Sequence, residues 1–353
     1  MPISATDAVT PAFQHTKEQL LRPFRAGQWA KLALVGFLAG ELSSGGCNGG
    51  SGFHLPPHTR GGHLPLPNVN PVLLAALIAL LIVVAVVFWM LFLYVNSVMR
   101  FILFDSVIAR RCEIRRSWGR WHWVGLRYFV WQLLFLFAMF VALTVLVAIP
   151  AALAFAAGWL EYPHQHMIPL VLGGMLLFCV VMSSVLLTLV VHVLTKDFVV
   201  PLMALENISA WEGWRRLLPM MRSEKGSYAG YLGMKIVLSL TAAMVVGIIT
   251  VIVVLILLIP VGGFGVIAVL AGKTAGLTWN LYTITLAVVV GCIVLAVLLY
   301  AVSFISVPAI VFFPAYSIYF FASRYPALDA LLHLPGVAVP QVPPLPQEPE
   351  PLG

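Results

Sequence analysis

The chain alternates between long apolar stretches and short stretches that hold nearly all of its charged residues. A membrane-spanning helix needs about 20 consecutive apolar residues to cross a hydrocarbon core of about 30 Å. Several stretches exceed this length without Asp, Glu, Lys or Arg, so the pattern predicts six membrane helices. Their predicted ranges are 26–42, 71–99, 128–157, 168–194, 232–260 and 280–306.

The first of these predicted helices has the weakest pattern. Only "LALVGFLAG" (32–40) is wholly apolar, and Lys31 and Glu41 flank it. A crossing here requires Arg25 and Lys31 to extend their charged ends to the membrane surface. A re-entrant segment is the alternative interpretation of this stretch.

Composition and charge distribution place the chain in a membrane. It has 353 residues, of which 61% are hydrophobic and 9% are charged, whereas about a quarter of a soluble domain is charged. A net charge of +7 could also indicate nucleic-acid binding. With six helices and both termini inside, however, all of the 20 basic residues except Arg60 and Lys273 fall on the inner side. This asymmetry is the positive-inside pattern of membrane proteins, so we expect no nucleic-acid partner.

Two inner segments of the chain resemble each other. "FILFDSVIARRCEIRRSWGR" and "DFVVPLMALENISAWEGWRR" align without gaps, so that Trp118 matches Trp214 and Arg120 matches Arg216. "SVPAIVFFPAYSIYFFASRYPAL" resembles a truncated third copy. The simplest interpretation is three helical hairpins joined by short amphipathic inner elbow helices. Convergence of basic, aromatic inner loops is the alternative.

This all-α, polytopic interpretation divides the chain into eight parts. They are a cytoplasmic amphipathic segment (1–25), hairpin 1 (26–99) with a Gly/Pro/His-rich outer loop (43–70), inner elbow 1 (100–127), hairpin 2 (128–194), inner elbow 2 (195–231), hairpin 3 (232–306), an inner partial elbow (307–334) and a Pro-rich tail predicted to be disordered (335–353).

The second elbow has the clearest local chemistry. Ser209 and Glu212 fit a capping box, which predicts a helix that starts after Ser209, and Pro219 predicts its end. Trp211, Trp214 and Leu218 share one face of that helix. A helix with aromatic residues on one face and arginines on another is typical of the membrane interface. The residues predicted to contact lipid or a protein partner in the two elbows are Arg115, Arg116, Trp118, Arg120, Trp121, Trp211, Trp214, Arg215 and Arg216.

No arrangement of residues in the sequence indicates catalysis or a cofactor. HExxH, P-loop and GxSxG motifs do not occur in the chain, and neither does a CxxC pair among its four cysteines. Imidazoles bind zinc or copper, and five histidines are predicted outside. These weak metal candidates are His54, His58, His63, His164 and His166. A polar loop that tolerates histidine is the simpler interpretation.

Several segments resemble those of an uncharacterised family of bacterial six-helix membrane proteins, a domain of unknown function. They are "FDSVIARR", "IRRSWGRW", "LRYFVWQL", "DFVVPLMALENISAWEGWRRLLPMMRSEKGSYAGYLGMKI" and "YFFASRYPAL". The resemblance is more distant to the membrane domain of some glycerophosphodiester phosphodiesterases, whose soluble catalytic domain has no counterpart here. The resemblance implies a multi-pass protein of the bacterial inner (cytoplasmic) membrane and no catalytic residue. The charge asymmetry predicts that both termini are cytoplasmic.

Three functional hypotheses follow from the sequence. The first is a non-enzymatic inner-membrane protein that organises lipids, anionic headgroups among them, or protein partners through its elbows. The second is a transporter or channel for a small or lipid-like solute. The third is a metal-dependent enzyme at the outer face. An oligomer is compatible with each of them.

Overall fold

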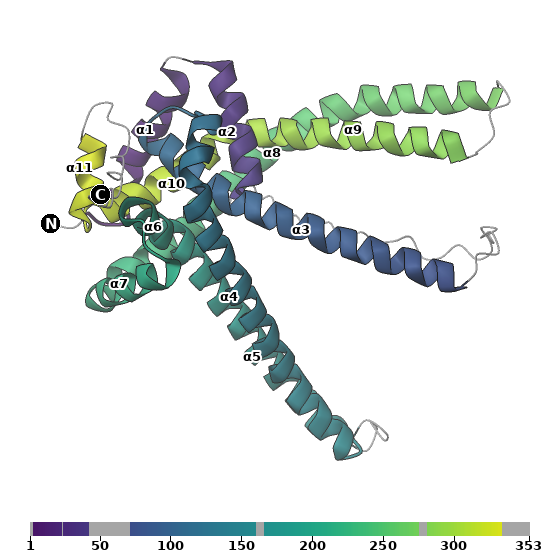
Figure 1. Ribbon diagram of the computed structural model, residues 1–353, viewed down its shortest axis with the longest axis horizontal. Coiled ribbons are helices and arrows are strands. Elements are labelled where there is room, and N and C mark those ends of the chain that lie inside the picture. Colours follow the sequence, from purple (N-terminus) through teal and green to yellow (C-terminus); the bar gives the residue numbers. More distant parts are fainter. Residues whose placement is uncertain (1–2, 23, 42–70, 160–165, 275–280, 334–353) are drawn as a thin grey trace, which may run out of the picture. The chain divides into compact units, whose positions relative to one another are not determined.

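The structure is a computed structural model that describes residues 3–22, 24–41, 71–159, 166–274 and 281–333. These residues form helices, turns and short connections, without a β-strand among them (Figure 1). The helices are α1 (Val9–Leu21), α2 (Ala26–Leu38), α3 (Pro71–Ile108), α4 (Ile114–Ala156), α5 (Met167–Leu194), the π-helix η2 (Thr195–Val199), α6 (Val200–Glu206), α7 (Ala210–Ser223), α8 (Lys225–Thr274), α9 (Leu281–Ile305), α10 (Val307–Ala322) and α11 (Pro326–His333).

Among the described residues, five helical segments are long and apolar enough to cross a membrane. They are Val72–Ile108, Ile114–Ala156, Met167–Glu206, Lys225–Pro260 and Tyr282–Ile305. In four of them, no residue of the most apolar 18-residue window is buried inside the protein. A helix that exposes apolar side chains in this way needs an apolar surrounding. Five of the six predicted ranges are therefore confirmed as apolar helices of membrane-spanning length.

The structure does not confirm the sixth predicted crossing, at 26–42. Helix α2 has only 13 residues, and it buries Leu32, Ala33, Val35 and Gly36. It packs against α9 and α10, and a Cβ added to Gly36 would lie 2.5 Å from Cγ2 of Ile310. The apolar pattern of this stretch thus forms a protein contact, and the helix is shorter than the roughly 20 residues that a crossing needs.

The described chain forms two compact units. The first comprises Met1–Gly49, Ile102–Trp118 and Ala229–Gly353, and the second comprises Gly50–Phe101 and Gly119–Tyr228. Helices α3, α4 and α8 each continue from one unit into the other. The predicted elbow 1 (100–127) is therefore divided between the units, whereas α7 belongs wholly to the second.

Helix α10 is the centre of the first unit. Eleven of its 16 residues are buried, and it contacts α1, α2, α9 and α11. Tyr231 of α8 is fully buried and lies on Tyr316 and Phe320, with ring centroids 5.1 Å and 4.7 Å apart. The Tyr316 hydroxyl donates a hydrogen bond of 3.0 Å to the carbonyl of Ala5. The predicted partial elbow at 307–334 is thus largely core, and α1 packs beside it.

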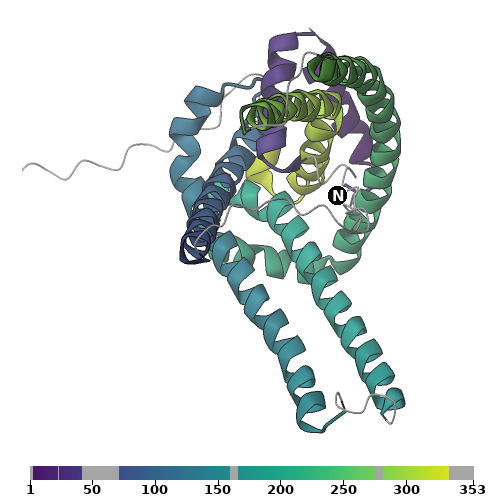
Figure 2. The ribbon, with the colours of Figure 1, turned by 90° about the vertical axis from the view of Figure 1, so that its right-hand side faces the viewer.

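The second unit contains α4 beyond Trp118, α5 and the apolar part of α3. Helices α4 and α5 run alongside each other in both views (Figures 1 and 2). At one end of these helices Phe101 stacks on Trp121 at 5.9 Å. There Arg100 donates a hydrogen bond of 2.8 Å to the Tyr128 hydroxyl, and its other terminal nitrogen lies 3.4 Å from Nε2 of His192. This polar and aromatic cluster joins three long helices.

Candidate functional site

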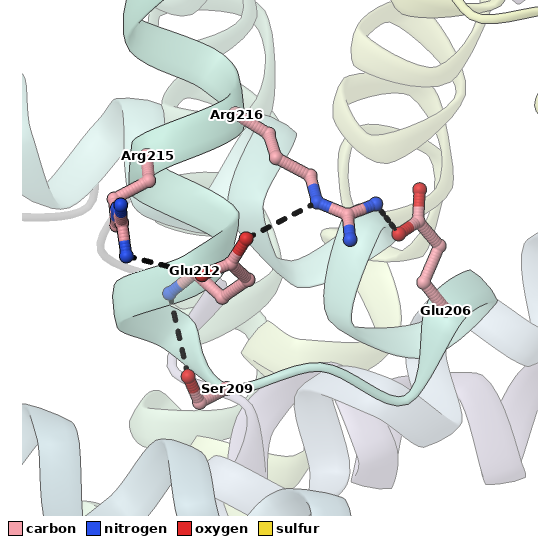
Figure 3. Close-up of polar contacts among 5 residues, drawn as sticks. All are labelled: Glu206, Ser209, Glu212, Arg215 and Arg216. Carbon is pink, nitrogen blue, oxygen red and sulfur yellow. Dashed lines mark hydrogen bonds and ion pairs between the residues drawn. The ribbon is translucent and has the colours of Figure 1, made fainter.

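Helix α7 begins where the sequence predicts. Ser209 has an extended backbone, and its hydroxyl accepts a hydrogen bond of 3.3 Å from the backbone N–H of Glu212 (Figure 3). This contact satisfies one of the amide groups that lack a partner at a helix start. The predicted end is wrong: Pro219 lies inside the helix, which continues to Ser223. The nitrogen of Pro219 cannot donate within the helix, but the later turn still forms.

Helix α7 has a buried face and an exposed aromatic face. Ala210, Gly213 and Leu217 are buried, and a Cβ on Gly213 would lie 2.8 Å from Cγ1 of Val199 in η2. Successive residues are about 100° apart around an α-helix. This spacing places Trp211, which is 70% exposed, and Leu218, which is 42% exposed, on a second face. The exposed aromatic face is therefore separate from the face that packs on the protein.

The arginines of α7 divide into two kinds. Arg216 forms ion pairs with Glu206 of α6 and, through Nε at 3.6 Å, with Glu212 (Figure 3). Arg215 lies 3.8 Å from Glu212 and points to the other side of the helix. Helical spacing places Arg215 beside the exposed aromatic face.

Arg222, exposed in the last turn, falls on the same border as Arg215. Arg216 therefore ties α7 to α6, whereas Arg215 and Arg222 flank Trp211 and Leu218. We name the surface formed by these last four residues the α7 surface.

Elbow 1 presents a different surface. Arg115 and Arg116 are exposed at the start of α4, and Arg116 lies 3.8 Å from Glu113. Trp118 and Arg120 are half-buried. Trp121 is only 4% exposed because it stacks on Phe101, so this residue lies in the core of the second unit.

The sequence interpretation missed two residues of the elbows that lie on the surface. Trp123, 66% exposed, is the exposed tryptophan of elbow 1. Arg222 was missed in elbow 2. The phase of the 3.6-residue repeat could have indicated Arg222, because Trp211 and Arg222 lie near each other on a helical wheel.

Most of the predicted outer histidines lie outside the described residues. These are His54, His58, His63 and His164; His166 is described and precedes α5. Within the described ranges, no three His, Cys, Asp or Glu side chains lie close enough together to hold a metal ion.

Burial raises the pKa of the Cys112 thiol, which favours its protonated form.

Residue His15 joins three parts of the first unit. Its Nε2 lies 2.9 Å from the carbonyl of Val107, and its Nδ1 lies 3.2 Å from the hydroxyl of Tyr319. A neutral ring that donates from Nε2 and accepts at Nδ1 satisfies both contacts. Burial, and then the positive charge of Arg110, lower the pKa of His15, while Glu18 raises it. The neutral ring therefore holds α1 against α10 and the end of α3.

This geometry predicts that α1 is less stably docked in acid. Because the pKa of His15 in the folded protein is below its usual value, the unfolded chain binds more protons in the interval between the two. The contribution of the neutral His15 ring to stability is thus fully present above about pH 6.5. This contribution falls as the pH drops toward the lowered pKa. Hydrogen exchange of the α1 amides, corrected for intrinsic rates, should be faster at pH 5.5 than at pH 7.5. H15Q should remove this difference, and equal pH dependence in H15Q would refute the assignment.

The part of the chain that the structure describes is all-helical and contains five helices of membrane-spanning length. The chain belongs to a family of unknown function, DUF7544, whose model matches residues 3–331. Among curated proteins and solved structures, no match to the chain was found. The similarity to the membrane domain of glycerophosphodiester phosphodiesterases stays a prediction from the sequence.

Proposed function

We propose that this protein is a non-enzymatic, multi-pass protein of the bacterial inner membrane that gathers anionic phospholipids at the inner face through the α7 surface. One observation carries the proposal: Trp211 and Leu218 are exposed on a short helix, with Arg215 and Arg222 beside them. Such a helix inserts its apolar face at the headgroup boundary and keeps its charges in the headgroup layer.

The position of α7 along the chain supports this depth. Helix α7 contacts η2 and α6, which follow directly after the apolar helix α5. Most residues of α5 are exposed, and burial begins at Leu194, at its end. Figure 1 shows α7 directed away from α4 and α5 rather than along them. A helix at this boundary lies near the membrane surface when α5 crosses the bilayer.

The proposed orientation places both termini on the cytoplasmic side. The positive-inside asymmetry assigns the elbows to that side. Helix α1 packs against α10, and Arg324 donates to the carbonyl of Ile3 at 3.3 Å, so the two ends of the described chain share a side. An even number of crossings is then required. The proposal therefore includes one crossing besides the five that the described residues contain.

The boundaries of the helices support duplication of the elbows. The offset that aligns Trp118 with Trp214 also aligns Ile114 with Ala210, which are the first residues of α4 and α7. Shortly before these helix starts, Arg110 and Asn207, which lie one position out of this alignment, have φ angles of 53° and 52°. Helices α6 and α10 both begin with Val-Pro. We interpret these parallels as copies of one hairpin-and-elbow unit.

The proposal is tested by the lipids that the protein retains. The full chain is reconstituted in nanodiscs with equal amounts of phosphatidylglycerol and phosphatidylcholine, released from them, and analysed by native mass spectrometry. Retention of phosphatidylglycerol above its share of the bilayer is the expected result. Retention of the two lipids in equal amounts would contradict the proposal.

A further inference from the structure

We infer that the first unit has a second contact with anionic lipid, at the end of α1 and the start of α2. The residues of this N-terminal edge are Lys17, Leu21, Arg22, Phe24, Arg25, Trp29 and Lys31. The inference rests on the proposed function for which side of the membrane the edge faces. Its residues, however, belong to another unit than α7 and are tested separately.

Apolar and basic side chains alternate on this edge. Leu21 is 54% exposed and Phe24 is 58% exposed. Lys17, Arg22, Arg25 and Lys31 are also exposed, and in the described part of the chain none of them has an acidic partner. The nearby carboxylate of Glu18 is paired with Arg110 at 2.9 Å. The edge therefore presents positive charge next to exposed apolar surface.

An aromatic cluster places the edge beside the end of an apolar helix. The rings of Phe24 and Trp29 are 5.5 Å apart, and Trp29 lies 5.4 Å from Phe304 in the last turn of α9. The indole N–H of Trp29 donates a hydrogen bond of 3.0 Å to the carbonyl of Leu20. Most residues of α9 up to Tyr300 are exposed, and Ser303 is buried. Aromatic rings at such a boundary are typical of the headgroup level.

The chemistry of the edge favours an anionic lipid surface as its partner. Each basic residue near such a surface strengthens binding by roughly fivefold. Tryptophan and phenylalanine also insert among headgroups and acyl chains, which an acidic protein partner would not offer. We therefore assign inner-leaflet anionic phospholipid to the N-terminal edge.

Photocrosslinking tests this assignment in the full chain. Proteoliposomes contain equal amounts of phosphatidylglycerol and phosphatidylcholine, and each lipid in turn carries the same diazirine near its headgroup. Mass spectrometry should find adducts within residues 21–31, with more from the anionic probe than from the zwitterionic one. In R22Q/R25Q the ratio of anionic to zwitterionic adducts should fall, by up to about 25-fold, whereas R22K/R25K should keep the wild-type ratio.

The outcomes separate this inference from the proposed function. Adducts on 210–223 without adducts on 21–31 would overturn the inference and leave the α7 surface in place. Adducts on 21–31 with equal yield from the two probes would overturn the anionic preference of the edge. Adducts on neither segment would overturn both the inference and the proposed function.

Discussion

Replacing Arg215 and Arg222 with glutamine should lower the affinity of the α7 surface for phosphatidylglycerol by about 25-fold relative to phosphatidylcholine. Each basic residue near an anionic surface contributes about 1 kcal/mol, and about 2 kcal/mol corresponds to this factor. The two side chains are exposed, and they border the face that carries Trp211. Native mass spectrometry of the R215Q/R222Q protein from nanodiscs should show fewer retained phosphatidylglycerol molecules than the wild type.

Two matched variants make this prediction specific. R215K/R222K keeps both charges and should retain phosphatidylglycerol nearly as well as the wild type. R216Q removes the ion pairs with Glu206 and Glu212. This variant should therefore loosen the contact of α7 with α6, and hydrogen exchange of the α7 amides should become faster. Both flanking charges, Arg215 and Arg222, remain in it. Unchanged lipid retention in R215Q/R222Q would show that the α7 surface is not the binding surface.

Replacing Tyr231 with alanine should destabilise the first unit by about 4 kcal/mol, because large-to-small changes of aromatic core residues cost about 3–5 kcal/mol. The ring of Tyr231 is fully buried between Tyr316 and Phe320, so its removal leaves a cavity against α10. For a chain of this size the Tm should fall by about 5 °C. Thermal unfolding in detergent, followed by tryptophan fluorescence, measures the shift.

An exposed tyrosine of the same unit provides the control for Y231A. Tyr282 lies near the start of α9 and is 83% exposed. Y282A in the same detergent should leave the Tm within about 2 °C of the wild type, because surface changes cost less than about 0.5 kcal/mol. Equal effects of Y231A and Y282A would contradict the placement of Tyr231 in the core around α10.

Run length and charge were sufficient to predict the five long apolar helices, because crossing a bilayer requires a local property of the chain. The same pattern misled at 26–42. A stretch such as "LALVGFLAG" is equally suited to lipid and to a packed core. Only its contact with the distant Ile310 shows that this stretch packs against protein. The burial of α10 could not be predicted from its own sequence either, because α1 and Tyr231, which are distant along the chain, cover it.

The start of α7 was predictable because capping is local. Of the two tryptophans predicted on its aromatic face, Trp211 is exposed, whereas Trp214 is half-buried with its indole nitrogen buried. The different roles of Arg215 and Arg216 were not predictable from the sequence, because Glu206 approaches Arg216 only after the chain reverses at Asn207. In elbow 1 the contact with Phe101 decides that Trp121 is buried while Trp123 is exposed. Sequence composition identified the basic, aromatic segments, and tertiary packing determines which side chains they present.

The central claim is that the exposed face of α7 lies among anionic headgroups. A spin label at position 211, introduced as W211C in a chain whose native cysteines are replaced, reports its depth through collisions with oxygen and with a water-soluble nickel complex. A label at Ser223, exposed on another face of α7, is the control. In phosphatidylglycerol-containing proteoliposomes, the label at 211 should lie at the headgroup level and the label at 223 in water. A label at 211 as accessible to the nickel complex as the label at 223 would contradict the account.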